Sequence, residues 1–295
     1  MASEELRTII GALQAMQTDT EPSIEELRTG YEAMGQMSPP PDGVTYEPAD
    51  AGGVPAEWAI PTGVPEGTAV VYLHGGGYVI GNLNTHRSLV GRIAQASARR
   101  VLAVDYRLAP EHPHPAALDD ALVAYRWLLS QGYEASKLAI AGDSAGGGLT
   151  LATLLALRDA GDPLPAAAVP ISPWTDLEMT GSTIETVDDP LITDASFLKR
   201  MADLYLDGQD AKQPAVSPLN GDLSGLPPML IHVGTQERLL DDSRRLAKRA
   251  KAAGVDATLE EWDEMIHVWH AFAPMLPEAN EAIDKVGAFV RAKLG

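Results

Sequence analysis

The sequence predicts an α/β fold: a mostly parallel central sheet with helices on both faces and a helical cap. From Thr68 onward, short apolar runs alternate with amphipathic segments, a pattern typical of parallel strands joined by helices. Residues 176–213 interrupt this alternation with helical pieces and no strand-like run. With 295 residues, 45% of them hydrophobic and 21% charged, the chain has the composition of a globular protein with a substantial core.

The N-terminal part is expected to be helical. Residues 1 to about 37 read as two helices, of which the first has its apolar residues on one face, and they end at the breaker SPPPDG. We therefore expect N-terminal cap helices over residues 1–43.

The remaining elements follow in order. Strands are expected in TAVVYLH, RVLAVDY, KLAIAG, AAAVPIS, PPMLIHVG and ATLEEW, and helices over about 87–98, 116–129, 146–160, 241–253 and 280–293. This order predicts a catalytic α/β domain over residues 44–175 and 214–295. Residues 176–213 emerge at the carboxyl ends of the strands, where ligands bind in open α/β sheets. We therefore expect this segment to form a cap insertion over the binding site.

Charge and composition exclude several classes of partner. A net charge of −19 disfavours nucleic acid and anionic membranes, which both need clustered Lys and Arg. The absence of cysteine excludes disulfides, thiolate metal sites and a cysteine nucleophile. Acidic residues stand near the N-terminus, where a signal peptide has basic residues. No apolar run approaches the ~20 residues that a membrane span requires. We expect a cytoplasmic protein with no membrane span.

A candidate nucleophile lies between an apolar strand and an apolar helix. Gly142-Asp143-Ser144-Ala145-Gly146 has the G-x-S-x-G pattern of a nucleophile elbow in the context that such an elbow requires. Glycines two residues before and after the serine let the strand and helix pass closely around a strained turn. The phosphate-binding patterns G-x-G-x-x-G and G-x-x-x-x-G-K-[ST] do not fit here. Ser144 is therefore the predicted nucleophile.

A second glycine motif indicates an oxyanion hole. His74-Gly75-Gly76-Gly77 follows a strand about seventy residues before the elbow. Consecutive glycines cost conformational entropy, which is understandable where backbone N–H groups must point into a site. The expected donors are the amides of Gly75 and Gly76, joined by Ala145. We expect His74 to position the loop rather than to act as the base.

The base is expected after the last strand, because this kind of fold orders its triad as serine, acid, histidine. His267 and His270 follow ATLEEW in EWDEMIHVWHAF. His267 comes first after the strand and is favoured, whereas His270 is expected to pack with Trp269 and Phe272. Structural roles are expected for the histidines at 86, 112, 114 and 232.

Three carboxylates in HVGTQERLLDDS compete for the role of acid. Glu237 lies in the loop just beyond the strand that ends at Gly234, from which it can face the loop of the base. Asp241 and Asp242 open the following helix, where acids are explained by the helix dipole. Glu237 is therefore favoured, since a longer carboxylate can still orient an imidazole if its loop withdraws by about one methylene.

Four motifs together resemble the hormone-sensitive-lipase-like (family IV) bacterial esterases of the α/β-hydrolase fold. They are HGGG at 74–77, DYRLAPEHPHPA at 105–116, GDSAGG at 142–147 and MIHVWH at 265–270. The likeness covers essentially the whole chain, cap included. It implies a Ser, Asp, His triad, an HGGG oxyanion hole and hydrolysis of carboxylic esters with short to medium acyl chains. It also implies a possible homodimer through the last strand and helix.

One position departs from the family pattern. The positions that match are Ser144, Gly75, Gly76, Ala145 and His267. The family has G-x-x-D-x-L after the next-to-last strand, and GTQERL puts Glu237 in place of that aspartate. Either Glu237 substitutes for it, or Asp241 or another carboxylate serves.

These residues predict a serine carboxylesterase without metal or cofactor, acting on a small-molecule ester. Ser144 would attack the ester carbonyl, His267 would take its proton, and water would resolve the acyl-enzyme. A non-catalytic small-molecule receptor on the same fold is the alternative from another class, and amide or lactone hydrolysis is a third. In DYRLAPE, Arg107 and Glu111 are expected to join Asp119 or Asp120 in a structural ion-pair network beneath the site.

Overall fold

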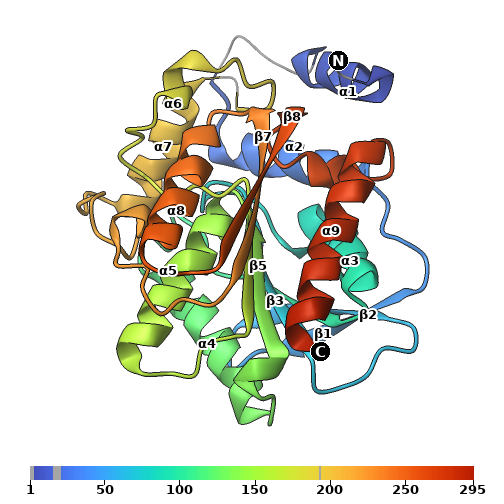
Figure 1. Ribbon diagram of the computed structural model, residues 1–295. Helices are drawn as coiled ribbons and strands as arrows, with labels where there is room; N and C mark the ends of the chain where they lie inside the picture. Colours follow the sequence, from blue (N-terminus) through green and yellow to red (C-terminus); the bar gives the residue numbers. More distant parts are fainter. Residues whose placement is uncertain (1–2, 16–20, 193) are drawn as a thin grey trace.

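The computed structural model describes residues 3–15, 21–192 and 194–295, and in these residues eight strands form one sheet (Figure 1). The strands are β1 (Val44–Asp50), β2 (Pro55–Pro61), β3 (Ala69–Leu73), β4 (Arg100–Val104), β5 (Leu138–Asp143), β6 (Ala167–Ile171), β7 (Met229–Gln236) and β8 (Ala257–Ile266). Their order in the sheet is β1-β2-β4-β3-β5-β6-β7-β8. All neighbours from β4 to β8 run parallel. The expected α/β fold with a mostly parallel sheet is therefore confirmed.

Helices connect the parallel strands and cover both faces of the sheet. They are α1 (Glu4–Ala15), α2 (Ile24–Gln36), α3 (Leu83–Ser97), α4 (Ala116–Ser130), α5 (Ala145–Ala160), α6 (Thr183–Thr186), α7 (Ala195–Leu206), α8 (Leu240–Ala252) and α9 (Pro277–Leu294). Figure 1 shows α3 and α9 on one face and α4, α5 and α8 on the other. Four residues of the expected first helix, at positions 1, 2, 16 and 17, lie outside the described residues.

Two apolar layers hold the sheet between these helices. Successive side chains of a strand point to opposite faces, so Val71 and Leu73 belong to the core shared with α4 and α5. Val70 and Tyr72 belong to the core shared with α3 and α9. All four side chains are fully buried, which explains why the parallel strands read as continuous apolar runs.

Strands β1 and β2 were not expected from the sequence. They form a hairpin in which Asp50 pairs with Pro55, and β2 runs antiparallel to β4. Pro48 lies within β1, and proline is tolerated there because β1 is the edge of the sheet. The glycines at 52 and 53 close the hairpin with positive φ angles of 76° and 96°, a turn signal that was present in the sequence.

Helices α1, α2, α6 and α7 lie at the end of the molecule where β7 and β8 end (Figure 1). Arg28 of α2 ties this layer to the loops that follow β3 and β4. Its guanidinium donates to the carbonyl oxygens of Val79 and Ala109, at 3.0 Å each, and pairs with Glu111 at 2.7 Å. Glu111 therefore pairs with α2, which corrects the expected network. Only Arg107 pairs as expected, with Asp120 at 2.7 Å.

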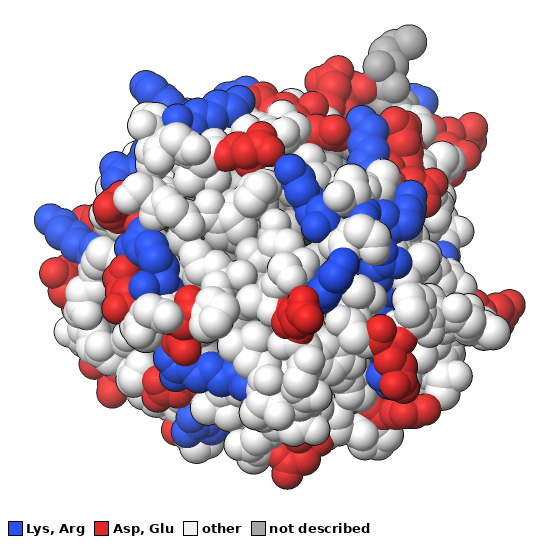
Figure 2. All heavy atoms as spheres, turned by 60° about the horizontal axis from the view of Figure 1, so that its bottom comes forward, with Lys and Arg blue, Asp and Glu red and all other residues white. Residues whose placement is uncertain are grey.

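The charged surface is mixed. Figure 2 views the molecule from below Figure 1 and shows Lys and Arg side chains interspersed with Asp and Glu. Surface pairs such as Arg126 with Asp162, at 2.6 Å, contribute little stability individually. Among the described helices, none combines the length and apolar character needed to cross a membrane.

Candidate active site

Ser144 occupies the sharp turn between β5 and α5. Its backbone has φ 53° and ψ −120°, a strained conformation for a residue with a side chain. Gly142 and Gly146 are required because the chain passes so closely: a Cβ on Gly142 would lie 2.6 Å from the carbonyl oxygen of Leu73, and one on Gly146 would lie 2.5 Å from that of His74. Ser144 thus stands at the N-terminus of α5, whose first-turn N–H groups favour negative charge.

The three residues of the predicted triad follow three parallel strands of one sheet. Ser144 follows β5, Glu237 follows β7 and His267 follows β8. The carboxyl ends of parallel strands lie at the same end of a sheet, so all three residues lie at that end. Ser144 N–H donates to Ile171 O at 2.9 Å, and Ser172 N–H donates to His232 O at 2.7 Å, which joins the ends of β5, β6 and β7.

Glu237 and His267 are in direct contact. Oε2 of Glu237 lies 2.8 Å from Nδ1 of His267, with Glu237 fully buried and His267 4% exposed. Oε1 of Glu237 accepts hydrogen bonds from the Ser172 hydroxyl at 2.9 Å and from Gly234 N–H. The Ser172 Oγ in turn accepts Val268 N–H at 3.2 Å. Both carboxylate oxygens are therefore occupied, and the loops of the acid and the base are joined through Ser172.

Burial and charge act in opposite directions on this pair. Burial lowers the pKa of His267, but the hydrogen bond and charge of Glu237 outweigh it, so the pKa lies above the usual 6.5. Burial raises the pKa of Glu237, and the hydrogen bond with His267 only partly offsets this. Glu237 thus stabilises an imidazolium at His267, which is what a general base needs when it takes a proton.

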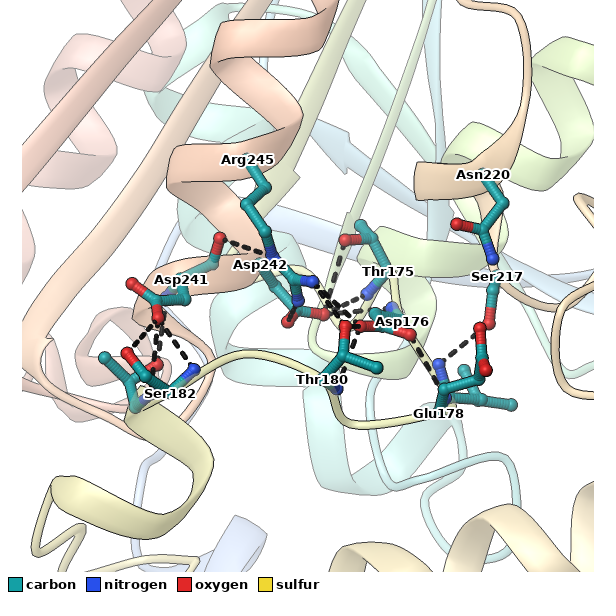
Figure 3. Close-up of polar contacts among 12 residues, drawn as sticks. Thr175, Asp176, Glu178, Thr180, Ser182, Ser217, Asn220, Asp241, Asp242 and Arg245 are labelled. Atoms are coloured by element: carbon teal, nitrogen blue, oxygen red, sulfur yellow. Dashed lines mark hydrogen bonds and ion pairs between the residues drawn. The ribbon is translucent and has the colours of Figure 1, made fainter.

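Asp241 and Asp242 bind backbone groups instead of a histidine (Figure 3). Oδ2 of Asp241 accepts Ser182 N–H at 2.9 Å and the Ser182 hydroxyl at 2.7 Å. Oδ2 of Asp242 accepts Thr175 N–H at 2.8 Å, and its Oδ1 pairs with Arg245 at 2.8 Å. These bonds fasten the segment that leads to α6 onto α8. The helix dipole was therefore an incomplete explanation for the two aspartates.

The glycine loop after β3 differs from expectation at Gly75. Gly75 N–H donates to Asp143 Oδ1 at 3.1 Å and contacts His86 Nε2 at 3.3 Å, so this N–H is already engaged inside the protein. Within the described part of the chain, the N–H groups of Gly76, Gly77 and Ala145 have no hydrogen-bond acceptor. The expectation for Gly75 is thus not supported, whereas Gly76 and Ala145 keep free donors and Gly77 adds one.

Asp143, the residue before Ser144, anchors this loop. Its fully buried carboxylate also accepts the Tyr72 hydroxyl at 2.7 Å and pairs with His86 at 3.3 Å. Burial acts to raise the pKa of Asp143, but His86 and Tyr72 outweigh it and hold the pKa below its usual 3.8. Sequence reasoning missed His86 because it lies within α3, with no motif around it.

Three other histidines have structural partners. Nε2 of His270 lies 3.1 Å from Nδ1 of His232, and its ring packs on Trp269 at 4.0 Å, as expected for a residue in the core. His74 stacks on Tyr106 at 4.2 Å, and its Nδ1 lies 2.8 Å from Gly75 O, which fits a loop-positioning role. No group of His, Asp and Glu side chains in the described ranges is arranged to hold a metal ion.

Comparison with known proteins identifies the family of this chain. Residues 70–271 match a family model described as the alpha/beta hydrolase fold. An acetyl-hydrolase of Streptomyces hygroscopicus is 45% identical over 100% of this chain and 99% of its own. An esterase of Acinetobacter venetianus is 36% identical over 75% of this chain and 73% of its own.

A solved structure has the same fold as this chain. The crystal structure of an esterase from the bacterial hormone-sensitive lipase family superposes with a TM-score of 0.97 at 48% identity, and each chain is covered completely. Sequence and structure comparisons therefore point to the same group of hydrolases, and the acetyl-hydrolase and the crystal structure match over the whole chain.

Proposed function

The chain belongs to the hormone-sensitive-lipase-like esterases of the α/β-hydrolase fold, and from this we propose a catalytic apparatus of Ser144, His267 and Glu237. The chain is a carboxylic ester hydrolase. We assign ester hydrolysis to these three residues. The main support for this assignment is the 2.8 Å contact between Glu237 and His267. It lies at the carboxyl ends of the strands, where Ser144 also lies. The receptor alternative is disfavoured because such a receptor has no use for this pair.

Acylation begins with proton transfer from the Ser144 hydroxyl to Nε2 of His267. Nδ1 is held by Glu237, which fixes the tautomer that leaves Nε2 free as the base. The Ser144 Oγ bonds to the ester carbonyl carbon, and the imidazolium then returns its proton to the departing alcohol. Water, activated by His267 in the same way, releases the acid from the acyl-enzyme.

The oxyanion is proposed to bind the N–H groups of Gly76, Gly77 and Ala145. These donors have no acceptor within the described residues, and Ala145 is the first residue of α5. Preorganised donors of this kind stabilise the charge that develops on the carbonyl oxygen. Gly75 is left out of the proposal, because its N–H is engaged by Asp143.

We propose that residues 1–43 and 176–213 form a cap that limits the acyl chain to short or medium length. Met201 of α7 supports this role, since its Cγ would lie 2.8 Å from a Cβ on Gly77. Tyr205 of α7 stacks on Tyr78 of the same loop at 3.9 Å. The cap helix is thus in contact with the loop that would bind the reacting carbonyl.

Hydrolysis of p-nitrophenyl esters of increasing acyl length tests the function. We expect activity on acetate to butyrate with a decline at longer chains, and loss of activity in Ser144→Ala. Hydrolysis by Ser144→Ala well above background would contradict the assignment. One relative is named an acetyl-hydrolase, so acetyl esters and acetyl amides should be compared first; a preference for the amide would move the activity to another bond class.

Two expectations stay predictions. A cytoplasmic location follows from the sequence reasoning alone, and fractionation of the native cells tests it. A homodimer through β8 and α9 follows from the resemblance, and light scattering of the purified protein measures it.

A further inference from the structure

Asp143 and His86 form a second buried carboxylate–imidazole pair beside the nucleophile, and the proposed triad does not use it. Oδ2 of Asp143 lies 3.3 Å from Nε2 of His86, and the two side chains are 1% and 6% exposed. Both meet at one backbone group, the N–H of Gly75, at 3.1 Å and 3.3 Å. The pair thus joins the end of β5, helix α3 and the loop after β3 at a single point.

The backbone around this point has most of its polar groups engaged. Besides Gly75 N–H, Gly75 O lies 2.8 Å from His74 Nδ1, His74 O accepts the Tyr106 hydroxyl at 2.6 Å, and Gly76 O accepts two amides. Those amides belong to Val79 and Ile80, at 3.1 Å and 2.9 Å. In the described residues, the N–H groups of Gly76 and Gly77 have no hydrogen-bond acceptor.

We propose that Asp143 and His86 are positioning residues for the oxyanion hole: Asp143 accepts Gly75 N–H, and His86 fixes the carboxylate of Asp143 by donating to its Oδ2, so that the next two amides turn toward the substrate. This inference rests on the proposed esterase mechanism and adds a role that the elbow motif alone does not assign. Without the pair, the peptide before Gly75 can rotate, and the following amides lose their fixed direction.

The chemistry of the pair suits this task. A carboxylate is a strong acceptor for a backbone N–H, and Gly75 is needed because a Cβ there would collide with the carboxylate of Asp143. A negative charge near an oxyanion would oppose catalysis unless donors surround it. Oδ1 of Asp143 is taken by Tyr72 and Gly75, and Oδ2 faces His86, so both oxygens face donors that screen the charge.

Steady-state kinetics of Asp143→Ala, Asp143→Asn and His86→Ala test the inference. Loss of aligned oxyanion donors lowers kcat, so we expect Asp143→Ala to lose about 100-fold in kcat with KM changed by less than about threefold. Asp143→Asn should recover to within about tenfold of the native enzyme, since its amide oxygen still accepts Gly75 N–H.

A tetrahedral-adduct inhibitor separates positioning from general destabilisation. The affinity of a trifluoromethyl ketone, which forms an oxyanion on binding Ser144, should fall by the same factor as kcat/KM. Asp120→Ala is the matched control: it also removes a buried carboxylate, but one whose hydrogen bonds go to Arg107 and not to the glycine loop. It should lower stability while kcat of the folded enzyme stays native.

The inference is overturned if Asp143→Ala and His86→Ala keep kcat within about threefold of native, or if Asp120→Ala loses as much kcat as they do. Should Asp143→Ala fail to fold, His86→Ala decides by the same criteria. Ser144→Ala is run beside them: an active Ser144→Ala refutes the proposed mechanism itself, whereas an inactive Ser144→Ala with fully active Asp143 variants refutes only the positioning role.

Discussion

Oε2 of Glu237 lies 2.8 Å from Nδ1 of His267, so a glutamate reaches the imidazole that an aspartate addresses in the related family pattern. The extra methylene is accommodated because the other carboxylate oxygen, Oε1, accepts hydrogen bonds from the Ser172 hydroxyl and from Gly234 N–H. A buried carboxylate with every oxygen engaged is rigid, which is what orientation of a base requires.

Replacement of Glu237 tests its role as the acid. We expect Glu237→Ala to lower kcat by about 10³–10⁴-fold, because His267 loses both its tautomer and the stabilisation of its charged form. Glu237→Asp should keep part of the activity, since only the reach of the carboxylate changes. Asp241→Ala is the control, with a native kcat expected. A large loss in Asp241→Ala together with a native Glu237→Ala would reverse the assignment.

The pH dependence of kcat/KM reports the base. As the proposed base, His267 must be neutral to accept a proton. The hydrogen bond and the charge of Glu237 outweigh burial and raise the pKa of His267 above 6.5, so activity should rise with pH to a plateau with a midpoint above 6.5. The charge of Asp189 contributes to the same increase. Asp189→Asn should therefore move the midpoint to lower pH. An unchanged midpoint, or a shift to higher pH, would show that the rise of kcat/KM with pH reports the titration of another group.

The pH dependence of stability reports Asp242. Burial raises the pKa of this carboxyl to about 7, against the opposing effects of Arg245 and Thr175. A raised carboxyl pKa stabilises the fold below the unfolded value of 3.8, and this contribution is lost as the pH rises through about 7. Between pH 5 and pH 8 the native protein should lose on the order of 2–3 kcal/mol of unfolding free energy from this group.

Urea unfolding of Asp242→Asn at both pH values isolates that contribution. The variant cannot titrate at this position, so its unfolding free energy should change less between pH 5 and pH 8 than that of the native protein. An equal change in both proteins would mean that Asp242 is ionised throughout this range.

Gly146→Ala tests the close passage at the elbow. Its Cβ would lie 2.5 Å from His74 O. That oxygen belongs to the backbone, so the strand and helix must separate, and we expect a loss of about 1–3 kcal/mol in stability and of most of the activity. Gly30→Ala in α2 is the matched control. Its Cβ meets nothing within 4 Å, so it should gain about 0.5–1 kcal/mol. Equal behaviour of the two variants would contradict this account of the elbow.

The sequence was most informative where one physical signal dominates. The parallel strands are buried on both faces, so their apolar runs were visible, and the glycines around Ser144 mark a turn that admits nothing larger. β1 and β2 lack such a signal, because β1 is a partly exposed edge strand with prolines in and around it. β2 also pairs with β4, which is distant in sequence.

Directions of backbone groups were not predictable in the same way. The three glycines predicted an oxyanion loop, but which N–H groups are free depends on Asp143 and His86, which approach from two other elements. Similarly, Glu111 pairs with Arg28 across 83 residues, a contact that no local pattern in DYRLAPE encodes. Tertiary packing decides both.

Covalent labelling by an organophosphate is the most direct test of the central claim that Ser144 is the nucleophile. We predict one label per chain, located on Ser144 by peptide mass spectrometry, with esterase activity lost in proportion to labelling. Ser144→Ala should be neither labelled nor active. A label on another residue that accounts for the lost activity, or an active Ser144→Ala, would contradict the account.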